Sequence, residues 1–228
     1  MWRYLWILVL FPLASYAGEG ETTFHAFTAE IGAGESRDGT LNQWELEGWV
    51  GGDIHKLNIK VEGEKLNNTP AETSEFWATY SRNVSEFWDA QIGVRYDEQP
   101  EANHHLVLGV EGTAPFFLET AFHLFVSEDG DVTATLSQMV ELLLTQRLIL
   151  EPYYELELSA QEIPQLETGS GITGGEIGVQ LRYEMTRKFA PYLDARYESK
   201  FGETADIALR DNESRDDFIA SIGLRLMF

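Results

Sequence analysis

The sequence predicts an all-β protein: a transmembrane antiparallel up-and-down β-barrel of about twelve strands. Three observations support this prediction. Apolar and polar residues alternate with a period of two, the alternating segments reach the roughly 9–11 residues of a tilted spanning strand, and long polar connections alternate with short ones. The clearest segment is "VELLLTQRLILEPYYELEL", Val140 to Leu158. It carries too many charges for a spanning helix but alternates regularly as strands.

The same alternation recurs in order along the chain. A first strand near residues 24–31 is less regular, and the pattern does not assign its inward face. The other expected strands cover residues 43–50, 56–64, 76–81, 88–96, 105–111, 118–126, 134–142, 147–158, 176–184, 193–198 and 218–228. Aromatic residues such as Trp88, Tyr96 and Tyr183 lie near strand ends, where interfacial girdles form. The chain ends in "GLRLMF", which resembles the aromatic-ended final strand of bacterial outer-membrane proteins.

The connections are expected to differ between the two ends of the barrel. "GAGESRDG", "SAQEIPQLETGSGITG" and "FGETADIALRDNES" are predicted to be long polar loops at one end, whereas "GGD", "TAPF" and "TQ" are predicted to be short turns at the other. Both termini then lie on the periplasmic side.

The first twenty residues have the pattern of a secretory signal. Arg3 precedes an apolar run from Leu5 to Leu13, and "SYA" ends in a small residue at Ala17. We predict a signal peptide over residues 1–17 and a barrel domain over residues 18–228. The alternative is an uncleaved membrane anchor, for which the apolar run is short.

Composition limits the possible functions. The 228 residues include 16 Lys and Arg against 38 Asp and Glu, a formal net charge of −22, and no cysteine. Disulfides and thiolate zinc sites are therefore excluded. So acidic a chain is unsuited to nucleic acid, because phosphates require basic partners, and we expect none as a partner. The charge favours cations, either bound or attracted by the field.

The orientation of the two strand faces decides what the interior contains. In a membrane the apolar face meets lipid, with outer-membrane lipid and lipopolysaccharide as surroundings, and the charged face lines the interior. The alternative is a soluble barrel or sandwich with the apolar face inside. The expected inner acids are Glu45, Glu47, Glu62, Glu64, Glu75, Asp89, Glu111, Glu119, Glu141, Glu151, Glu155, Glu157, Glu176, Glu184, Asp194 and Glu198. The expected inner bases are Lys56, Lys60, Arg82, Arg95, Arg147, Arg182, Arg196 and Arg225.

The inner face also predicts a histidine pair. A short turn at Thr113–Phe116 would set the register of its hairpin. Glu111 would then lie opposite Glu119. His105 would lie diagonal to His123, within reach of long side chains.

Later connections extend this patch. Met139 is expected opposite both Glu119 and Tyr153, and Glu141 is expected opposite Glu151. Imidazole and thioether groups suit copper, and thioether suits Cu(I) in particular. The predicted copper site comprises His105, His123, Met139, Glu111, Glu119, Glu141 and Glu151. The alternative is that Met139 fills a packing gap, the histidines bond to water and ion pairs hold the lumen together.

Several stretches together resemble the copper resistance protein B family (CopB/PcoB) of Gram-negative outer membranes. They are "WELEGWVGGD", "KVEGE", "ATYSR", "FWDAQIGVRYD", "LGVEGTAPFF", "ELLLTQRLILEP", "GGEIGVQLRYEMTRKFAPYLDARYESKFGETAD" and "GLRLMF". The resemblance implies an outer-membrane barrel that binds copper as cargo and supports copper tolerance. It also implies a periplasmic multicopper oxidase partner, CopA/PcoA.

One difference from the family pattern concerns the metal ligands. Many members carry a segment rich in Met and His before the barrel, whereas here the barrel is expected to begin soon after Gly20. The methionines of the sequence are Met1, Met139, Met185 and Met227. Copper is therefore expected to be bound by residues of the barrel itself; the alternative is copper binding weaker than the family name suggests.

Two other functions remain possible from the sequence. One is a general pore that attracts cations without a specific metal site. The other is an outer-membrane lipid hydrolase, which requires a serine beside a histidine. His55 and His104 lie near strand ends, but neither has an evident serine partner. We therefore expect a protein that is not an enzyme.

Overall fold

The computed structural model describes residues 23–66, 73–99 and 102–228. The predicted signal peptide, residues 1–17, and the first residues of the predicted barrel domain lie outside these ranges. None of the helices among the described residues is long and apolar enough to span a membrane.

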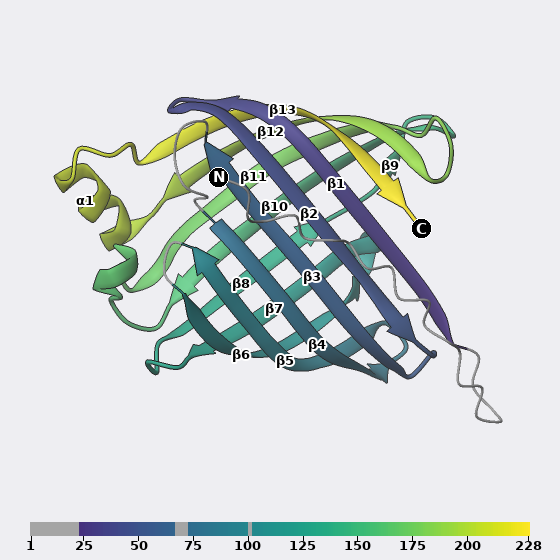
Figure 1. The fold of residues 1–228 in the computed structure, drawn as a ribbon, viewed down its shortest axis with the longest axis horizontal. Helices are drawn as coiled ribbons and strands as arrows, with labels where there is room; N and C mark the ends of the chain where they lie inside the picture. The colour runs from purple at the N-terminus through teal and green to yellow at the C-terminus, as the bar shows by residue number, and fades with distance from the viewer. Residues whose placement is uncertain (1–22, 67–72, 100–101) are drawn as a thin grey trace, which may run out of the picture.

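The described strands form one antiparallel sheet that closes on itself, because β10 pairs with β11 and β13 pairs with β1 (Figure 1). At the closure, the Phe228 N–H donates to the Phe27 carbonyl at 2.9 Å. The strands are β1 (Phe24–Ser36), β2 (Gly39–Gly51), β3 (His55–Leu66), β4 (Thr73–Ser85), β5 (Trp88–Gln99), β6 (Asn103–Ala114), β7 (Leu118–Ser127), β8 (Val132–Met139), β9 (Leu142–Leu143), β10 (Leu148–Ser159), β11 (Gly171–Tyr183), β12 (Phe189–Lys200) and β13 (Asp216–Met227).

β8 and β9 occupy one position in this wall. Both pair with β10, and the break between them falls at Val140 and Glu141. The barrel therefore has twelve strand positions, which confirms the predicted fold class. The weak first strand also forms fully, pairing with β2 along its whole length from Phe24 to Ser36.

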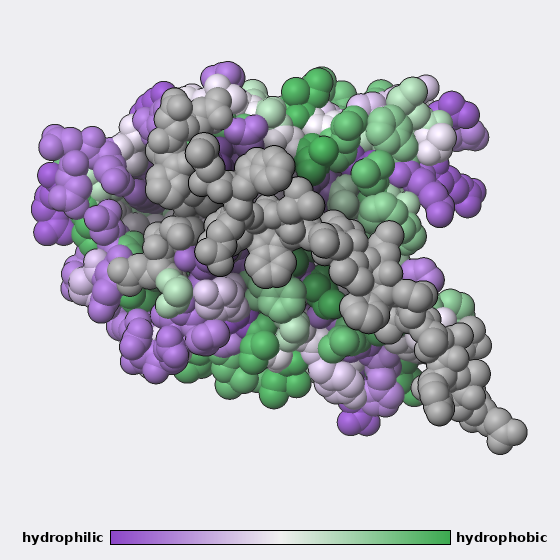
Figure 2. Space-filling model, viewed as in Figure 1, coloured by the Kyte–Doolittle hydropathy of each residue, from purple (hydrophilic) through white to green (hydrophobic). Residues whose placement is uncertain are grey.

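The apolar faces of the strands point outward. Ile92, Ile177 and Ile222 are 51%, 63% and 62% exposed, whereas the inward Glu151 is 8% exposed and lies between outward Leu150 and Pro152. Figure 2 shows hydrophobic residues over the strands and hydrophilic residues toward the two ends. Burial of charge with exposure of isoleucine is the reverse of a soluble core and fits a lipid environment.

The two ends of the barrel differ as expected, with two corrections. Residues 160–170, which contain η2 (Pro164–Leu166), and residues 201–215, which contain α1 (Gly202–Arg210), lie at one end, called the loop end. The connections at the other, turn end are short. α1 was expected to be loop. "GAGESRDG" was expected to be a long loop, but Ser36 pairs with Gly39 around a tight turn.

Candidate functional site

Carboxylates occupy matching positions on neighbouring strands of the inner wall. One row runs across β1 to β5, where each acid lies directly opposite the next: Glu30, Glu45, Glu62, Glu75 and Asp97. A second row crosses β10 to β13 in the same manner: Glu155, Glu176, Glu198 and Asp217. Like charges directly opposite one another destabilise a sheet, so each row requires cationic partners.

Three basic side chains form ion pairs with acids of the first row and neutralise part of its negative charge. Lys60 Nζ lies 2.7 Å from Glu62 and 3.7 Å from Glu45. Arg95 contacts Asp97 at 2.7 Å and Glu75 at 3.4 Å. Arg225 lies 3.3 Å from Glu30. Three cations against five acids leave the row with a surplus of negative charge.

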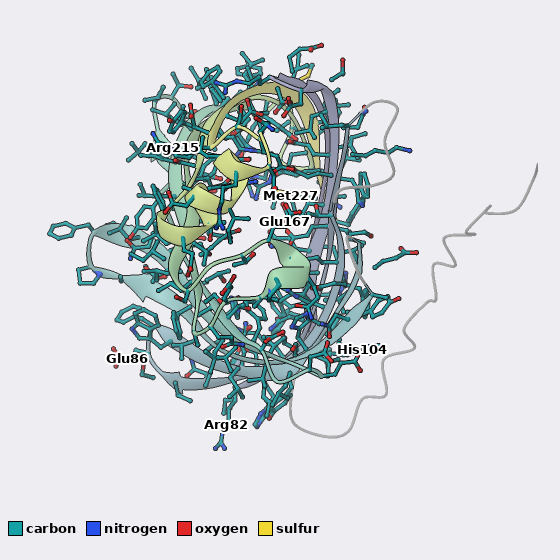
Figure 3. The ribbon with its side chains drawn as sticks, turned by 90° about the vertical axis from the view of Figure 1, so that its left-hand side faces the viewer. Arg82, Glu86, His104, Glu167, Arg215 and Met227 are labelled. Carbon is teal, nitrogen blue, oxygen red and sulfur yellow. The ribbon has the colours of Figure 1, made fainter. Side chains whose placement is uncertain are left out.

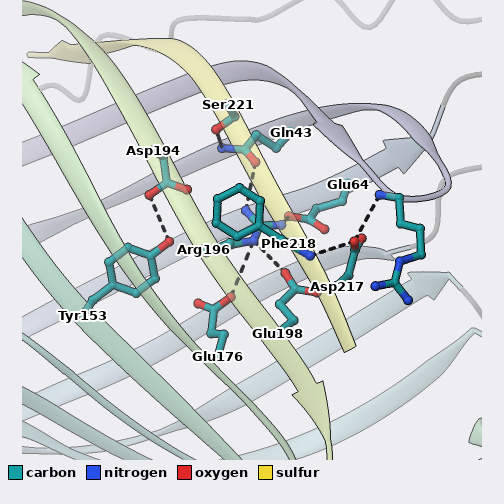
Figure 4. A network of polar contacts seen from close by, with 11 residues as sticks. Gln43, Glu64, Tyr153, Glu176, Asp194, Arg196, Glu198, Asp217, Phe218 and Ser221 are labelled. Atoms are coloured by element: carbon teal, nitrogen blue, oxygen red, sulfur yellow. Dashed lines mark hydrogen bonds and ion pairs between the residues drawn. The ribbon is translucent and has the colours of Figure 1, made fainter. Parts of the chain in front are cut away.

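Arg196 serves the second row and reaches across the lumen (Figure 4). From β12 it lies 2.6 Å from Glu198 and 3.7 Å from Glu176, both in the row. It also lies 2.5 Å from Glu64 on β3 and donates to Gln43 on β2 at 3.0 Å. These contacts join walls that are not neighbours in the sheet, so side chains cross part of the interior.

His123 lies on the inner wall among polar and aromatic neighbours. It is 8% exposed, and its Nε2 is 3.2 Å from both the Gln91 Oε1 and the Glu111 Oε1. The Trp77 ring meets it edge-on with 5.3 Å between ring centroids. A buried imidazole beside a carboxylate oxygen is a suitable pair of ligands for a transition metal.

His105 lies nearer the loop end and is also 8% exposed. Its Nε2 is 2.9 Å from Asp97 Oδ2. Phe125 lies between the two histidines, with ring centroids 6.5 Å from His105 and 6.2 Å from His123. The structure therefore places these two predicted ligands in separate surroundings.

The predicted register of the β6–β7 hairpin is wrong by two residues. Glu111 lies opposite Ala121 rather than Glu119, and His123 lies opposite Gly109. The cause is the turn: η1 (Pro115–Phe117) contains two residues with positive φ, so the closing pair moves to Ala114 and Leu118. Because the shift is even, the same side chains still face inward.

That shift means that His105 is not diagonal to His123, because His105 lies opposite Ser127. The inner base Arg82 is also misplaced in the prediction. Its side chain is exposed and points away from the barrel (Figure 3).

The remaining predicted ligands lie toward the turn end. Met139 lies opposite both Glu119 and Tyr153, as predicted. Arg182 forms ion pairs with both Glu141 and Glu151, so these two acids are brought together by a guanidinium. A cation at Met139 therefore has Glu119 as its nearest register partner among the predicted acids.

The seven predicted ligands thus fall into three groups along the inner wall. They lie around His105, around His123 with Glu111, and around Met139 with Glu119. Among the described residues no cluster of three or more His, Cys, Asp or Glu side chains is arranged to hold a metal ion. Any single site built from these groups must recruit amide oxygens, thioether or water as further ligands.

The two histidines considered for hydrolysis have aromatic partners. His55 Nδ1 lies 2.5 Å from the Tyr80 hydroxyl, and His104 packs on Tyr96 with 4.9 Å between ring centroids. In the described part of the chain, no serine hydroxyl bonds to either ring.

Solved structures show the same architecture. The NanC porin superposes with a TM-score of 0.60 at 12% identity, covering 87% of this chain and 98% of the porin. The KdgM porin in complex with disordered oligogalacturonate gives 0.56 at 14% identity, covering 88% and 99%. At such low identity the likeness establishes the fold alone.

Sequence relatives are more informative. A copper resistance protein B homolog of Pseudomonas syringae pv. tomato (strain ATCC BAA-871 / DC3000) is 37% identical over 195 residues, covering 85% of this chain and 66% of the relative. Copper resistance protein B of Escherichia coli is 35% identical over 193 residues, covering 84% and 65%. The chain thus spans just under two thirds of the length of each relative. The family model described as "Copper resistance protein B precursor (CopB)" matches residues 23–228. The chain therefore belongs to the copper resistance protein B family of outer-membrane β-barrels.

Proposed function

We propose that this barrel binds copper on its inner wall and thereby contributes to copper resistance. The observation that carries the proposal is the pair of buried histidines, His105 and His123, each with a carboxylate oxygen within 3.2 Å of its Nε2. Imidazole is a strong ligand for copper, and the surrounding acid surplus attracts cations. Membership of the copper resistance protein B family supports copper as the metal.

Three groups of candidate copper ligands, called stations, follow one another along the wall formed by β6 to β8. His105 lies toward the loop end, His123 with Glu111 lies further along, and Met139 with Glu119 lies toward the turn end. Glu141 and Glu151 lie near the last station and, through Arg182, tune its charge. The thioether at Met139 suits Cu(I), whereas the histidine stations suit either oxidation state.

Titration of the folded protein with copper tests this proposal. Isothermal titration in detergent, with Cu(I) and with Cu(II), is expected to give saturable binding that falls at least tenfold in a His105→Ala/His123→Ala/Met139→Ala variant. His104→Ala is the matched control, because His104 adjoins His105 but faces outward against Tyr96. Wild-type affinity in the triple variant would contradict the site assignment.

The cellular role has its own test. A deletion strain complemented with the wild-type chain should regain copper tolerance, and the triple variant should not, at equal amounts in the outer membrane. Copper-dependent capture of the periplasmic oxidase CopA/PcoA by the wild-type barrel would extend the role to that partner.

A general cation pore is the second candidate, favoured by the acid surplus and the porin-like fold. It predicts comparable K⁺ and Cu²⁺ flux in liposomes without saturable copper binding. The same surplus opposes passage of an acidic chain such as the oligogalacturonate bound by KdgM.

A further inference from the structure

A partly covered cavity of about 370 Å³ lies at the loop end of the barrel. Residues 160–170 and α1 lie over this mouth (Figure 3). Ile163, from the covering segment, lines the cavity and is 3% exposed. Gln161 donates to Asp131 at 2.8 Å, and the Gly169 N–H donates to the Thr204 hydroxyl at 2.9 Å. The cover is therefore held from both sides, by the β7–β8 turn and by α1.

Three polar side chains of β5 and β6 line this cavity together. Asp97 lies directly opposite Asn103, and His105 is two residues further along the same face. Cross-strand and same-face neighbours at this spacing lie within side-chain reach of one another. Asp97, Asn103 and His105 thus form a compact group of one carboxylate, one amide and one imidazole.

This group is buried with unsatisfied atoms. Among the described residues, Asp97 Oδ1, Asn103 Oδ1 and His105 Nδ1 have no hydrogen-bond partner. Burial of such atoms without a partner is unfavourable, because they lose their hydrogen bonds to water. The other oxygen, Asp97 Oδ2, accepts from Arg95 at 2.7 Å and lies 2.9 Å from His105 Nε2, so Oδ1 remains available. A bound group that accepts electron pairs from nitrogen and oxygen would satisfy all three side chains.

The spacing also fits a metal. His105 Nε2 and Asp97 Oδ2 form a close polar contact at 2.9 Å. Adjacent ligands of a square-planar ion, with bonds of about 2.0–2.1 Å, lie about 2.9 Å from each other. An ion bound between these two atoms would therefore replace their contact without requiring the side chains to move apart.

The net negative charge of the cavity lining favours a positively charged ligand. Its acidic lining residues outnumber its two bases, Arg95 and Lys200; the acids are Glu75, Asp97, Asp129, Asp131, Glu157 and Glu167. The lining includes neither Met139, Met185 nor Met227, so it offers no thioether. Imidazole with oxygen ligands and no sulfur suits a divalent ion of borderline hardness.

We propose that this covered cavity is a Cu(II) site whose protein ligands are His105, Asp97 and Asn103, with water completing the coordination. The inference rests on the proposed function, because it assigns the ligands and oxidation state of the station at His105. It makes the loop-end station selective for Cu(II) and leaves Cu(I) to the thioether at Met139.

Asn103→Leu is the diagnostic variant, because it removes one ligand oxygen without changing charge. We expect Cu²⁺ titration of the detergent-folded variant to show one site weakened at least tenfold, with Cu(I) binding at the wild-type level. His105→Gln should remove that Cu(II) site, and His104→Gln should not. Electron paramagnetic resonance of the wild type loaded with one Cu²⁺ should show an axial signal with nitrogen coupling that is lost in His105→Gln.

Heat-modifiable gel mobility confirms that each variant is folded before titration. Wild-type Cu²⁺ affinity and spectrum in both Asn103→Leu and His105→Gln would overturn this site. If binding then falls only in His123→Ala or Met139→Leu, the proposed function survives without it. A wild-type protein that binds no copper would overturn both. Displacement of Cu²⁺ by millimolar Ca²⁺ would also overturn the site, because a hard ion does not compete for an imidazole ligand.

Discussion

Replacing Arg196 with leucine removes the guanidinium that joins β12 to β3 across the lumen. Loss of one partner from a buried ion pair costs about 3–5 kcal/mol when all groups are buried. The Arg196 side chain is 8% exposed, but those of Glu64, Glu176 and Glu198 are 33%, 30% and 40% exposed. Water therefore screens the acids that are left unpaired, and we expect a loss of about 2–3 kcal/mol.

Urea unfolding of the barrel in detergent measures this loss. With a slope of about 2 kcal/mol per molar urea, the midpoint should fall by about 1–1.5 M. Adding Glu198→Gln should recover part of it, because one orphaned negative charge is removed. Arg210→Leu, on the exposed surface of α1, is the control and should shift the midpoint little. A midpoint for Arg196→Leu equal to that of the control would refute the reasoning.

Three further predictions follow from the fold and the inner wall. Ile92→Arg places a charge on the outward face near the middle of β5 and should cost about 2–4 kcal/mol in lipid vesicles, whereas Ile92→Leu should be neutral; equal unfolding midpoints would argue against lipid contact there. Thr204→Val removes the acceptor of the buried Gly169 N–H. Limited proteolysis within residues 160–170 should therefore become about fivefold to tenfold faster. An unchanged rate would mean that α1 does not hold residues 160–170 in place. Cu²⁺ bound at His123 should quench the fluorescence of Trp77, which touches it, while Zn²⁺ should not; a Trp77→Phe variant that keeps the full quenching would place the metal elsewhere.

The fold was predictable because a barrel in lipid imposes a period of two on nearly every segment. Outward isoleucines alternate with inward acids and make that period visible in the sequence. The two-residue error in the predicted register of the β6–β7 hairpin leaves the assignment of faces unchanged. The weak pattern of residues 24–31 has a physical cause. Phe24 and Ala26 share the inner face with Glu30, whereas His25 lies on the opposite face, so neither face is uniformly polar or apolar.

The site was less predictable because it depends on distances across strands. The sequence pointed to His105 and His123, but the left-handed φ of Phe116 and Phe117, which lengthens the hairpin turn, was not visible in it. The alternating pattern does not single out Asp97 and Asn103, because they are the first and last residues of the polar stretch "DEQPEAN" between two strands. Their cross-strand pairing beside His105 would have been the signal to follow.

The carboxylates that face one another on β1 to β5 also have a consequence for ion movement. Barrel strands lean by about 35–45° from the axis, so a line drawn perpendicular to them climbs by about 3 Å per strand. The acids from Glu30 to Asp97 therefore do not lie at one depth in the lumen. They follow a helical path along the inner wall that rises by about 12 Å from the first to the fifth strand. An ion passed from one acid to the next would move along the barrel axis and around the barrel wall at the same time. It would arrive beside His105.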